Sequence, residues 1–342
     1  MTLMSLKLKK GEDNMKIPNK IKKGDTIGGI APSSPIEDKD IEQINKSIKL
    51  LEDYGFKVIF AKNAYENTLG YSATAKQRAE DINEMFADKD IKAIFCITGG
   101  FNSSSVFEYL DYDLISKNPK ILCGFSDNTS ITNMISQKSG IVTFNGPTLK
   151  SLTSWETDYA YNQVIKKFVQ GKTHLLEDDE ECYTIKPGHA IGKLVGGNLS
   201  LTTKLTSGKY SIDFKDKIIF LEELAYESSP EMVCENFYNM KQNGIFNQIK
   251  GIWLGNYEGE IPIEKILLDV IGDEYDFPII KSNNFGHIDK KMVIPIGVKA
   301  EINTEDKVKI KLLEKCVNGD GEIWHAHLGT LHIEDIKNVQ IE

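Results

Sequence analysis

The strongest constraint on the fold is a regular alternation of short apolar runs with amphipathic stretches between residues 24 and 146. The runs are typical of buried strands, whereas the stretches between them space their apolar residues along one helix face, as Ile41, Ile44, Ile48 and Leu51 show. Strands that alternate with helices form a parallel sheet covered by helices on both faces. We therefore predict an α/β N-terminal domain, built on a doubly wound parallel sheet, over residues 15–150. The predicted strands are 26–32, 56–61, 91–97, 121–125 and 141–144, and the predicted helices are 38–54, 74–86, 104–110 and 127–139.

The pattern changes twice after residue 150. Between residues 151 and 189 the regularity fades and five acidic residues follow one another at 177–181, which indicates either a solvated connector or a lid over a site. From residue 190 to residue 342 short strands and helices mix without a repeat, which predicts an α+β C-terminal domain of mixed strands beside the first. A chain of 342 residues is long enough for two such domains.

The charge balance and the lengths of the apolar runs exclude several function classes. Forty-one basic residues against 50 acidic ones give a formal net charge of -9, which is the wrong sign for a protein that binds nucleic acid. Every apolar run is far shorter than the roughly 20 residues of a membrane span, so we expect no membrane partner. The stretch before Met15 lacks the apolar core of a signal peptide, so we expect a cytoplasmic protein, with Met1 or Met15 as its native start.

Residue types limit the chemistry further. The five cysteines are odd in number and widely spaced, which indicates small buried apolar residues and not a disulfide or zinc framework. Arg78 is the only arginine, so a bound anion must be met by lysine, by backbone N–H groups or by a helix N-terminus. His325 and His327 would share one face of a strand, but further ligands of suitable spacing are missing nearby, so no metal is predicted.

Three segments combine glycine with reactive polar groups at predicted strand ends. In 98–105 (TGGFNSSS) bare backbone N–H groups can approach a ligand oxygen, although a plain turn between strand and helix has the same pattern. In 124–130 (GFSDNTS) Ser126 stands at a turn like that of a hydrolase nucleophile, although a serine that caps a helix is common there. In 285–297 (FGHIDKKMVIPIG) His287 lies in a loop, where it either reaches a partner or faces solvent.

A serine nucleophile needs a base and an acid that orients the base. The predicted strand 217–223 ends in Glu222 and Glu223, and an acid at the carboxyl end of a strand is well placed to hold a histidine. Ser126, Glu222 and His287 are therefore candidates for a triad in the order serine, acid, histidine.

Six motifs follow one another in a single order, and their combination is far more specific than any one of them. They are TGGFNSSSVFEYLDYD, NPKILCGFSDNTS, FNGP, GKLVGGNLS, IIFLEE and FGHIDKKMVIPIG. In this combination the chain resembles the LD-carboxypeptidase family of serine peptidases, from about residue 24 to about residue 299. That family includes murein tetrapeptide carboxypeptidases and microcin C immunity peptidases.

The resemblance implies a two-domain cytoplasmic enzyme, usually a homodimer, whose active site lies where the domains meet. Ser126 matches the nucleophile of the family, Glu222 its acid and His287 its base. Glu223 remains an alternative acid, because side chains alternate along a strand and only one of the two glutamates can face the histidine.

The resemblance also implies how the reaction proceeds. Ser126, activated by His287, attacks a carbonyl near the C-terminal end of the substrate. The N–H groups of Gly100 and Asp127 match the oxyanion hole that stabilises the resulting charge. Neither a metal nor an organic cofactor is expected.

Local residues indicate a branch of the family. Murein-type members commonly carry an arginine before the glycine pair, whereas this chain has Thr98 there, with Asn102 and Ser103 after the pair, and is closer to the microcin C immunity branch. That branch cleaves the amide between an amino acid and a nucleotide-like sulfamoyl or phosphoramidate group. Where the immunity peptidase stacks a tryptophan on the nucleobase, this chain has Cys182 next to Tyr183.

We therefore predict a serine hydrolase that acts on a small-molecule aminoacyl-nucleotide conjugate. The alternatives are a muramoyl-tetrapeptide LD-carboxypeptidase of murein recycling, with a peptide substrate, and a non-catalytic ligand-binding relative. The residues predicted to contact the substrate are Asn102, Ser103, Tyr183 and Asn198.

Overall fold

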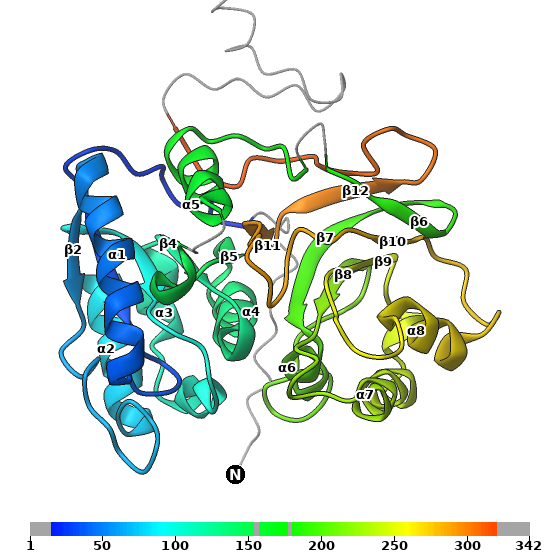
Figure 1. The fold of residues 1–342 in the computed structure, drawn as a ribbon, viewed down its shortest axis with the longest axis horizontal. Coiled ribbons are helices and arrows are strands. Elements are labelled where there is room, and N and C mark those ends of the chain that lie inside the picture. The colour runs from blue at the N-terminus through cyan, green and yellow to red at the C-terminus, as the bar shows by residue number, and fades with distance from the viewer. Residues whose placement is uncertain (1–14, 154–156, 177–179, 320–342) are drawn as a thin grey trace, which may run out of the picture.

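Two β-sheets organise the chain, one built mainly from each half (Figure 1). The computed structural model describes residues 15–153, 157–176 and 180–319. The first sheet has the order β11-β5-β4-β3-β1-β2, and its five N-terminal strands run parallel, as the alternating pattern predicts. Its strands are β1 (Thr26–Ile30), β2 (Lys57–Phe60), β3 (Ile91–Cys96), β4 (Ile121–Gly124), β5 (Thr143–Asn145) and β11 (Ile294–Ile296).

Helices connect the strands of the first sheet. The helix predicted at 38–54 buries Ile44 and Leu51 of the apolar stripe that predicted it, whereas Ile41 is exposed. It ends at Gly55 in the left-handed conformation. The next helix begins with a capping box between Thr74 and Gln77. The helices are α1 (Asp38–Tyr54), α2 (Ala75–Ala87), α3 (Tyr112–Lys117) and α4 (Thr129–Ser139).

Two predicted helices begin as tighter turns than expected. The segment predicted at 104–110 is a 3-10 helix, η1 (Ser103–Glu108), and the one predicted from residue 127 begins with a 3-10 turn, η2 (Ser126–Asn128), before α4. The Ser103 N–H at the start of η1 donates to the Asp127 carboxylate (2.7 Å). This hydrogen bond ties the two turns together at the carboxyl ends of β3 and β4.

The second sheet has the order β13-β12-β7-β8-β9-β10-β6 and mixes strand directions. Strands β7 to β10 are parallel, whereas β6, β12 and β13 are antiparallel to their neighbours, and α6, α7 and α8 lie on one side of the sheet (Figure 1). A parallel first sheet beside this mixed sheet confirms the predicted fold class. The elements are β6 (Tyr183–Lys186), β7 (His189–Asn198), α6 (Leu199–Lys204), β8 (Lys217–Glu222), α7 (Pro230–Gln242), η5 (Ile245–Asn247), β9 (Gly251–Leu254), α8 (Ile263–Ile271), β10 (Ile279–Lys281), β12 (Lys299–Asn303) and β13 (Ile310–Leu312).

Much of the predicted connector, residues 151–189, packs against the sheets. Phe168 lies edge-on to Phe95 and Phe144 of the first sheet, with ring centroids 5.9 and 4.7 Å apart, and β6 forms an edge of the second sheet. The acidic run predicted as a connector or lid lies in part, at 177–179, outside the described residues. The helical elements here are η3 (Leu149–Ser151), α5 (Tyr159–Val164) and the π-helix η4 (Ile165–Val169).

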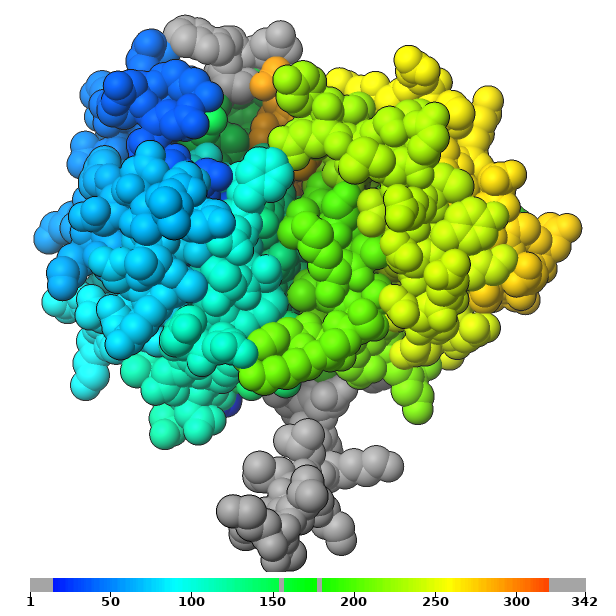
Figure 2. Space-filling view, turned by 90° about the horizontal axis from the view of Figure 1, so that it is seen from below, coloured from blue at the N-terminus to red at the C-terminus, as the bar shows by residue number. Residues whose placement is uncertain are grey.

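The first sheet with its helices forms the N-terminal lobe, and the second sheet with its helices forms the C-terminal lobe. Two features join these lobes. Strand β11 comes from the C-terminal half but pairs antiparallel with β5 of the first sheet. The glycine-rich end of β7 docks on α4, where Asn133 accepts a hydrogen bond from the Gly196 N–H (3.0 Å) and donates one to the Gly196 carbonyl (2.8 Å). A Cβ on Gly197 would lie 2.5 Å from Thr129 Oγ1, so a residue without a side chain is required. Figure 2 shows the lobes side by side, with a hollow between them.

The described residues also bear on the expectations about cysteines, membranes and metals. Three of the five cysteines are buried and two are partly buried, all as free thiols. Within the described ranges no helix has the length and apolar character needed to cross a membrane, and no group of three or more His, Cys, Asp and Glu residues is arranged to hold a metal ion. His325 and His327 lie outside the described residues.

Candidate active site

Ser126 occupies a strained turn between β4 and α4. Its φ of 62° lies in the left-handed region, which costs a residue with a side chain about 1–2 kcal/mol. Because β4 ends at Gly124, the hydroxyl stands at the carboxyl end of a central strand. The Asn128 amide fixes the turn by donating to the carbonyls of Thr98 (3.1 Å) and Phe125 (3.0 Å). The second glycine of a GxSxG turn is thus replaced by a side chain that ties two strand ends together.

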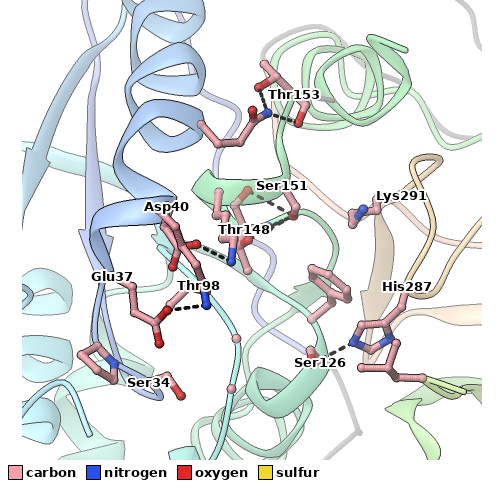
Figure 3. Close-up of a pocket in the computed structure, with 18 of the residues that line it drawn as sticks. Ser34, Glu37, Asp40, Thr98, Ser126, Thr148, Ser151, Thr153, His287 and Lys291 are labelled. Atoms are coloured by element: carbon pink, nitrogen blue, oxygen red, sulfur yellow. Dashed lines mark hydrogen bonds and ion pairs between the residues drawn. The ribbon is translucent and has the colours of Figure 1, made fainter. Parts of the chain in front are cut away.

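His287 links Ser126 to Glu222 through two hydrogen bonds. Its Nε2 lies 2.9 Å from Ser126 Oγ, and its Nδ1 lies 2.7 Å from Glu222 Oε2. Figure 3 shows Ser126 and His287 meeting at one side of a pocket. The Glu222 carboxylate, at the end of β8, is almost completely buried. Hydroxyl, imidazole and carboxylate in this order can activate a serine for attack on a carbonyl.

The loop that carries His287 is anchored next to Glu222. Phe285 packs against Trp253, with ring centroids 4.8 Å apart. Gly286 has a φ of +126°, and a Cβ there would lie 3.2 Å from Glu222 Oε2. Glycine therefore lets the backbone pass beside the carboxylate that the following histidine contacts.

Glu223 points away from His287. Its carboxylate accepts hydrogen bonds from the Asn198 side-chain amide (2.7 Å) and from the Ser200 N–H (2.9 Å) at the start of α6. Neighbouring residues of an extended strand face opposite sides, so only one of the two glutamates can meet the imidazole. The structure places Glu222, and not Glu223, in that contact.

The environment of His287 raises its pKa above the ordinary value. Burial lowers this pKa, but the charge and the hydrogen bond of Glu222, together with the charge of Glu223, raise it by more. The Lys291 ammonium acts in the lowering direction. A raised pKa makes the imidazole a stronger base beside the Ser126 hydroxyl.

The pair Gly99-Gly100 brings bare backbone close to Ser126. A Cβ on Gly99 would lie 3.1 Å from Ser126 Cβ, and a Cβ on Gly100 would lie 1.8 Å from Ser34 Oγ. Gly100 also has a φ of +124°, which favours glycine. Ser34 holds the segment by accepting a hydrogen bond from the Phe101 N–H (3.3 Å).

The Asp127 side chain holds the serine turn in place. Its carboxylate is buried and accepts hydrogen bonds from Ser33 Oγ (2.5 Å) and from the Ser103 N–H (2.7 Å). Burial raises the pKa of Asp127, while these hydrogen bonds act to lower it. The Ser103 hydroxyl also donates to the Asp127 carbonyl (2.7 Å). Hydrogen bonds therefore fix both the side chain and the carbonyl group of the residue that follows Ser126.

The four residues predicted to contact the substrate lie outside the pocket lining. Asn102 and Ser103 lie at the start of η1, with Ser103 buried. Asn198 is buried at the start of α6, where it binds Glu223. Tyr183 is exposed on the edge strand β6. Their contact with a substrate stays a prediction.

Ser126 and His287 open into a pocket of about 980 Å³ between the lobes. Figure 3 shows Glu37 and Asp40, from the beginning of α1, on one side of this pocket and Lys291 on the other. Neither Glu37 and Asp40 nor Lys291 was predicted from the sequence as a site residue. The loop after β1 was identifiable, because ligands of parallel sheets lie beyond the carboxyl ends of the strands.

Comparison with protein families identifies the chain. The N-terminal domain of LD-carboxypeptidases matches residues 27–146, and the C-terminal domain of the same family matches residues 191–302. The chain belongs to the LD-carboxypeptidase family. It is a serine peptidase, and the resemblance inferred from its motifs is confirmed.

Relatives of this LD-carboxypeptidase are named for two activities. The chain is 32% identical over 309 residues to a probable murein peptide carboxypeptidase of Bacillus subtilis, covering 86% of this chain and 93% of the relative. It superposes on MccF, named a microcin C7 self-immunity protein in Escherichia coli, in complex with glutamyl sulfamoyl guanosine. The TM-score is 0.80 and the identity 26%, over 88% of this chain and 99% of that chain. An MccF-like protein from Bacillus anthracis str. Ames has a TM-score of 0.77 and 32% identity, over 86% and 98% of the two chains.

Proposed function

We propose that this LD-carboxypeptidase hydrolyses an amide, with Ser126 as the nucleophile, His287 as the general base and Glu222 as the acid that orients the imidazole. The observation that carries the proposal is the continuous pair of hydrogen bonds, 2.9 Å from Ser126 to His287 and 2.7 Å from His287 to Glu222, beside a large pocket. The left-handed turn at Ser126 supports the same assignment, because it projects the hydroxyl from the end of a strand.

The proposed reaction is acyl transfer through an ester on Ser126. The hydroxyl oxygen attacks the amide carbon while its proton passes to His287 Nε2, and the N–H groups of Gly100 and Asp127 donate to the oxyanion. His287 then gives the proton to the leaving nitrogen as the C–N bond breaks. A water molecule, deprotonated by His287, hydrolyses the ester and regenerates the serine. The Glu222 carboxylate stabilises the imidazolium.

An aminoacyl-nucleotide conjugate is the substrate class that we propose first. Its amide joins an amino acid to a sulfamoyl or phosphoramidate group. The structural likeness to MccF bound to glutamyl sulfamoyl guanosine supports this choice, as does the identity with the MccF-like protein. The pocket volume of about 980 Å³ is at the upper end of the range for small-molecule sites and leaves room for a nucleotide.

A murein L,D-tetrapeptide is the second candidate substrate. The supporting observation is the 32% identity with the probable murein peptide carboxypeptidase of Bacillus subtilis. Both substrate classes present an amide carbonyl to a serine, so the proposed triad serves either one.

Incubation of the purified protein with each substrate, read by mass spectrometry, tests the proposed function. Cleavage of the aminoacyl sulfamoyl adenylate alone supports the first substrate class, and cleavage of the tetrapeptide alone supports the second. The Ser126→Ala variant serves as the control and should cleave neither. A fluorophosphonate probe that fails to label Ser126, with no turnover of either substrate, would favour a non-catalytic binding relative.

We also propose that the enzyme is a cytoplasmic homodimer. Residues 15–150 form the domain with the nucleophile, residues 190–342 form the domain with the acid and the base, and residues 151–189 join them as a connector or lid. The match of separate family domains to residues 27–146 and 191–302 supports this division. Light scattering coupled to gel filtration tests the dimer, and a molar mass of one chain, 38.4 kDa, contradicts it.

A further inference from the structure

Lys291 lines the active-site pocket on the same side as His287 (Figure 3). Its ammonium donates to the Ile288 carbonyl within its own loop and lies 5.5 Å from the centre of the Phe125 ring. That ring in turn lies 5.1 Å from the His287 ring. The Lys291 ammonium and the imidazole that contacts Ser126 therefore lie near the same aromatic ring.

Within the part of the chain that the structure describes, Lys291 has no carboxylate partner of the kind that Lys39 and Lys150, the other lysines of the pocket lining, have. Lys39 pairs with Glu37, and Lys150 pairs with Asp40 at 2.7 Å. Among the described residues, no carboxylate oxygen lies within 4.0 Å of the Lys291 ammonium. Its contacts are a backbone carbonyl and an aromatic face, which leave part of its three-donor capacity for a ligand.

The surroundings of Lys291 make an anion there more favourable than elsewhere in the pocket. The side chain is only partly exposed, and this burial lowers the pKa of Lys291, while the charges of Asp289 and Glu222 raise it. A cation that is withdrawn from water without a paired anion gains free energy when an anion reaches it. Across the pocket, Glu37 and Asp40 are each paired with a lysine, so the charges of Lys39 and Lys150 are already balanced by a carboxylate in contact. The Asp289 carboxylate of the Lys291 loop also lines the pocket, but it forms no ion pair with Lys291 within the described residues.

The proposed reaction determines which part of the substrate lies near Lys291. His287 must deliver a proton to the leaving nitrogen, so the group beyond that nitrogen extends along the His287 side of the pocket. In a peptide this group carries the terminal carboxylate, one carbon away from the nitrogen. In an aminoacyl conjugate it is a phosphoryl or sulfonyl group bonded directly to the nitrogen. Both substrate classes thus place anionic oxygens near the same position.

We propose that Lys291 is a specificity-determining residue that binds the anionic group on the leaving side of the scissile amide. This inference rests on the proposed function. The ligand chemistry is a carboxylate, phosphoryl or acyl-sulfamate anion adjacent to the leaving nitrogen. Binding through a charged hydrogen bond acts on substrate affinity, so loss of the ammonium should raise KM by about 10- to 100-fold and change kcat little.

Steady-state kinetics of Lys291→Gln with matched substrates tests the proposal. The tetrapeptide with a free C-terminal carboxylate is compared with its C-terminal carboxamide, and the aminoacyl sulfamoyl adenylate forms the second arm. For Lys291→Gln we expect the raised KM with every anionic substrate and a loss of the preference for carboxylate over carboxamide, whereas Lys291→Arg keeps that preference. Lys290→Gln removes an exposed neighbouring charge and should leave all values unchanged.

Three outcomes separate this inference from the proposed function. If the wild-type enzyme cleaves a substrate but Lys291→Gln keeps its KM and its preference, the inference is overturned and the proposed function stands. If the wild type cleaves nothing, calorimetric binding to Ser126→Ala decides, because equal affinity for the carboxylate and the carboxamide would overturn the inference. If Lys291→Gln does not fold, the wild type itself must prefer the carboxylate by at least about 10-fold for the proposal to hold.

Discussion

Asn133 and Gly196 exchange two hydrogen bonds across the junction of the lobes, at 3.0 and 2.8 Å. Asn133 belongs to α4, the helix that begins after the Ser126 turn, and Gly196 lies near the end of β7. Two residues further along β7, Asn198 is the register partner of Glu222 on β8. The docking of β7 on α4 therefore brings the Glu222 carboxylate toward the serine turn of the other lobe.

Replacing Gly197 by alanine should separate the two lobes at this junction. The new Cβ would lie 2.5 Å from Thr129 Oγ1 on a backbone with a φ of +139°, so we expect a loss of about 2–4 kcal/mol in the free energy of unfolding. Activity should fall with it, because the Ser126 to His287 distance depends on the junction. Urea unfolding and turnover of the same samples measure both effects.

Gly208→Ala is the matched control for this substitution. Gly208 also has a positive φ, +84°, but a Cβ there would meet nothing within 4 Å. The Gly208→Ala substitution should lower the free energy of unfolding only through backbone strain, by about 1–2 kcal/mol, and should leave kcat unchanged. Equal effects of the two substitutions would show that the close approach to Thr129 has no special role.

Ser126→Ala and Ser126→Gly should have the same effect on catalysis but different effects on stability. Both remove the nucleophile, so kcat should fall by about 10⁴- to 10⁶-fold. Ser126 has a φ of 62°, so only glycine relieves the backbone strain. We expect the glycine variant to be more stable than the alanine variant by about 1 kcal/mol in thermal unfolding. Near-normal turnover of either variant would refute Ser126 as the nucleophile.

The two neighbouring glutamates should respond differently to amide substitution. Glu222→Gln removes the charge that orients and stabilises the His287 imidazolium, and kcat should drop by about 10⁴-fold, as in comparable triads. Glu223→Gln instead disturbs the hydrogen bonds from Asn198 and Ser200, which should cost about 1–3 kcal/mol of stability. A larger kcat loss for Glu223→Gln than for Glu222→Gln would reverse the proposed assignment.

The acid limb of the pH profile should reflect the raised pKa of His287. The base must be neutral to accept the Ser126 proton, so kcat/KM should rise with pH and reach half its plateau above pH 6.5, the ordinary value. Glu223→Gln removes a charge that raises this pKa, so the midpoint should move down. Lys291→Gln removes a charge that lowers it, so the midpoint should move up. Stopped-time assays of kcat/KM against pH measure these midpoints. Midpoint shifts of the opposite sign would contradict the effects assigned to the Glu223 and Lys291 charges.

Gly100→Ala should impair catalysis through the backbone beside the nucleophile. The added Cβ would lie 1.8 Å from Ser34 Oγ, and the φ of +124° adds strain, so the Gly100 N–H should leave its position. Loss of one oxyanion donor lowers kcat by about 10²- to 10³-fold. Gly140→Ala, at another positive φ but with open space around it, should retain kcat. A KM effect without a kcat effect would argue against an oxyanion role for Gly100.

Much of the fold was predictable from local patterns. The alternation of apolar runs and amphipathic stretches identified the five parallel strands, because burial imposes its periodicity on neighbouring residues. Ser126 and His287 were also identifiable, since each follows a glycine motif at a strand end or in a loop. The 3-10 turn at η1 was not, because its geometry depends on a hydrogen bond from the Ser103 N–H to the distant Asp127 carboxylate.

The strands, the family and the candidate hydroxyl, imidazole and carboxylate residues were all predictable from the amino-acid sequence. The contact of Glu222, and not Glu223, with His287 and the crossing of β11 to the first sheet depend on how the two halves of the chain pack. The same packing places Lys291 in the pocket lining without a carboxylate partner among the described residues. Periodicity along the chain specifies which face of an element is buried but not against which other element. Ser126 and His287 are 161 residues apart, and only the packing of both lobes brings their side chains within 2.9 Å.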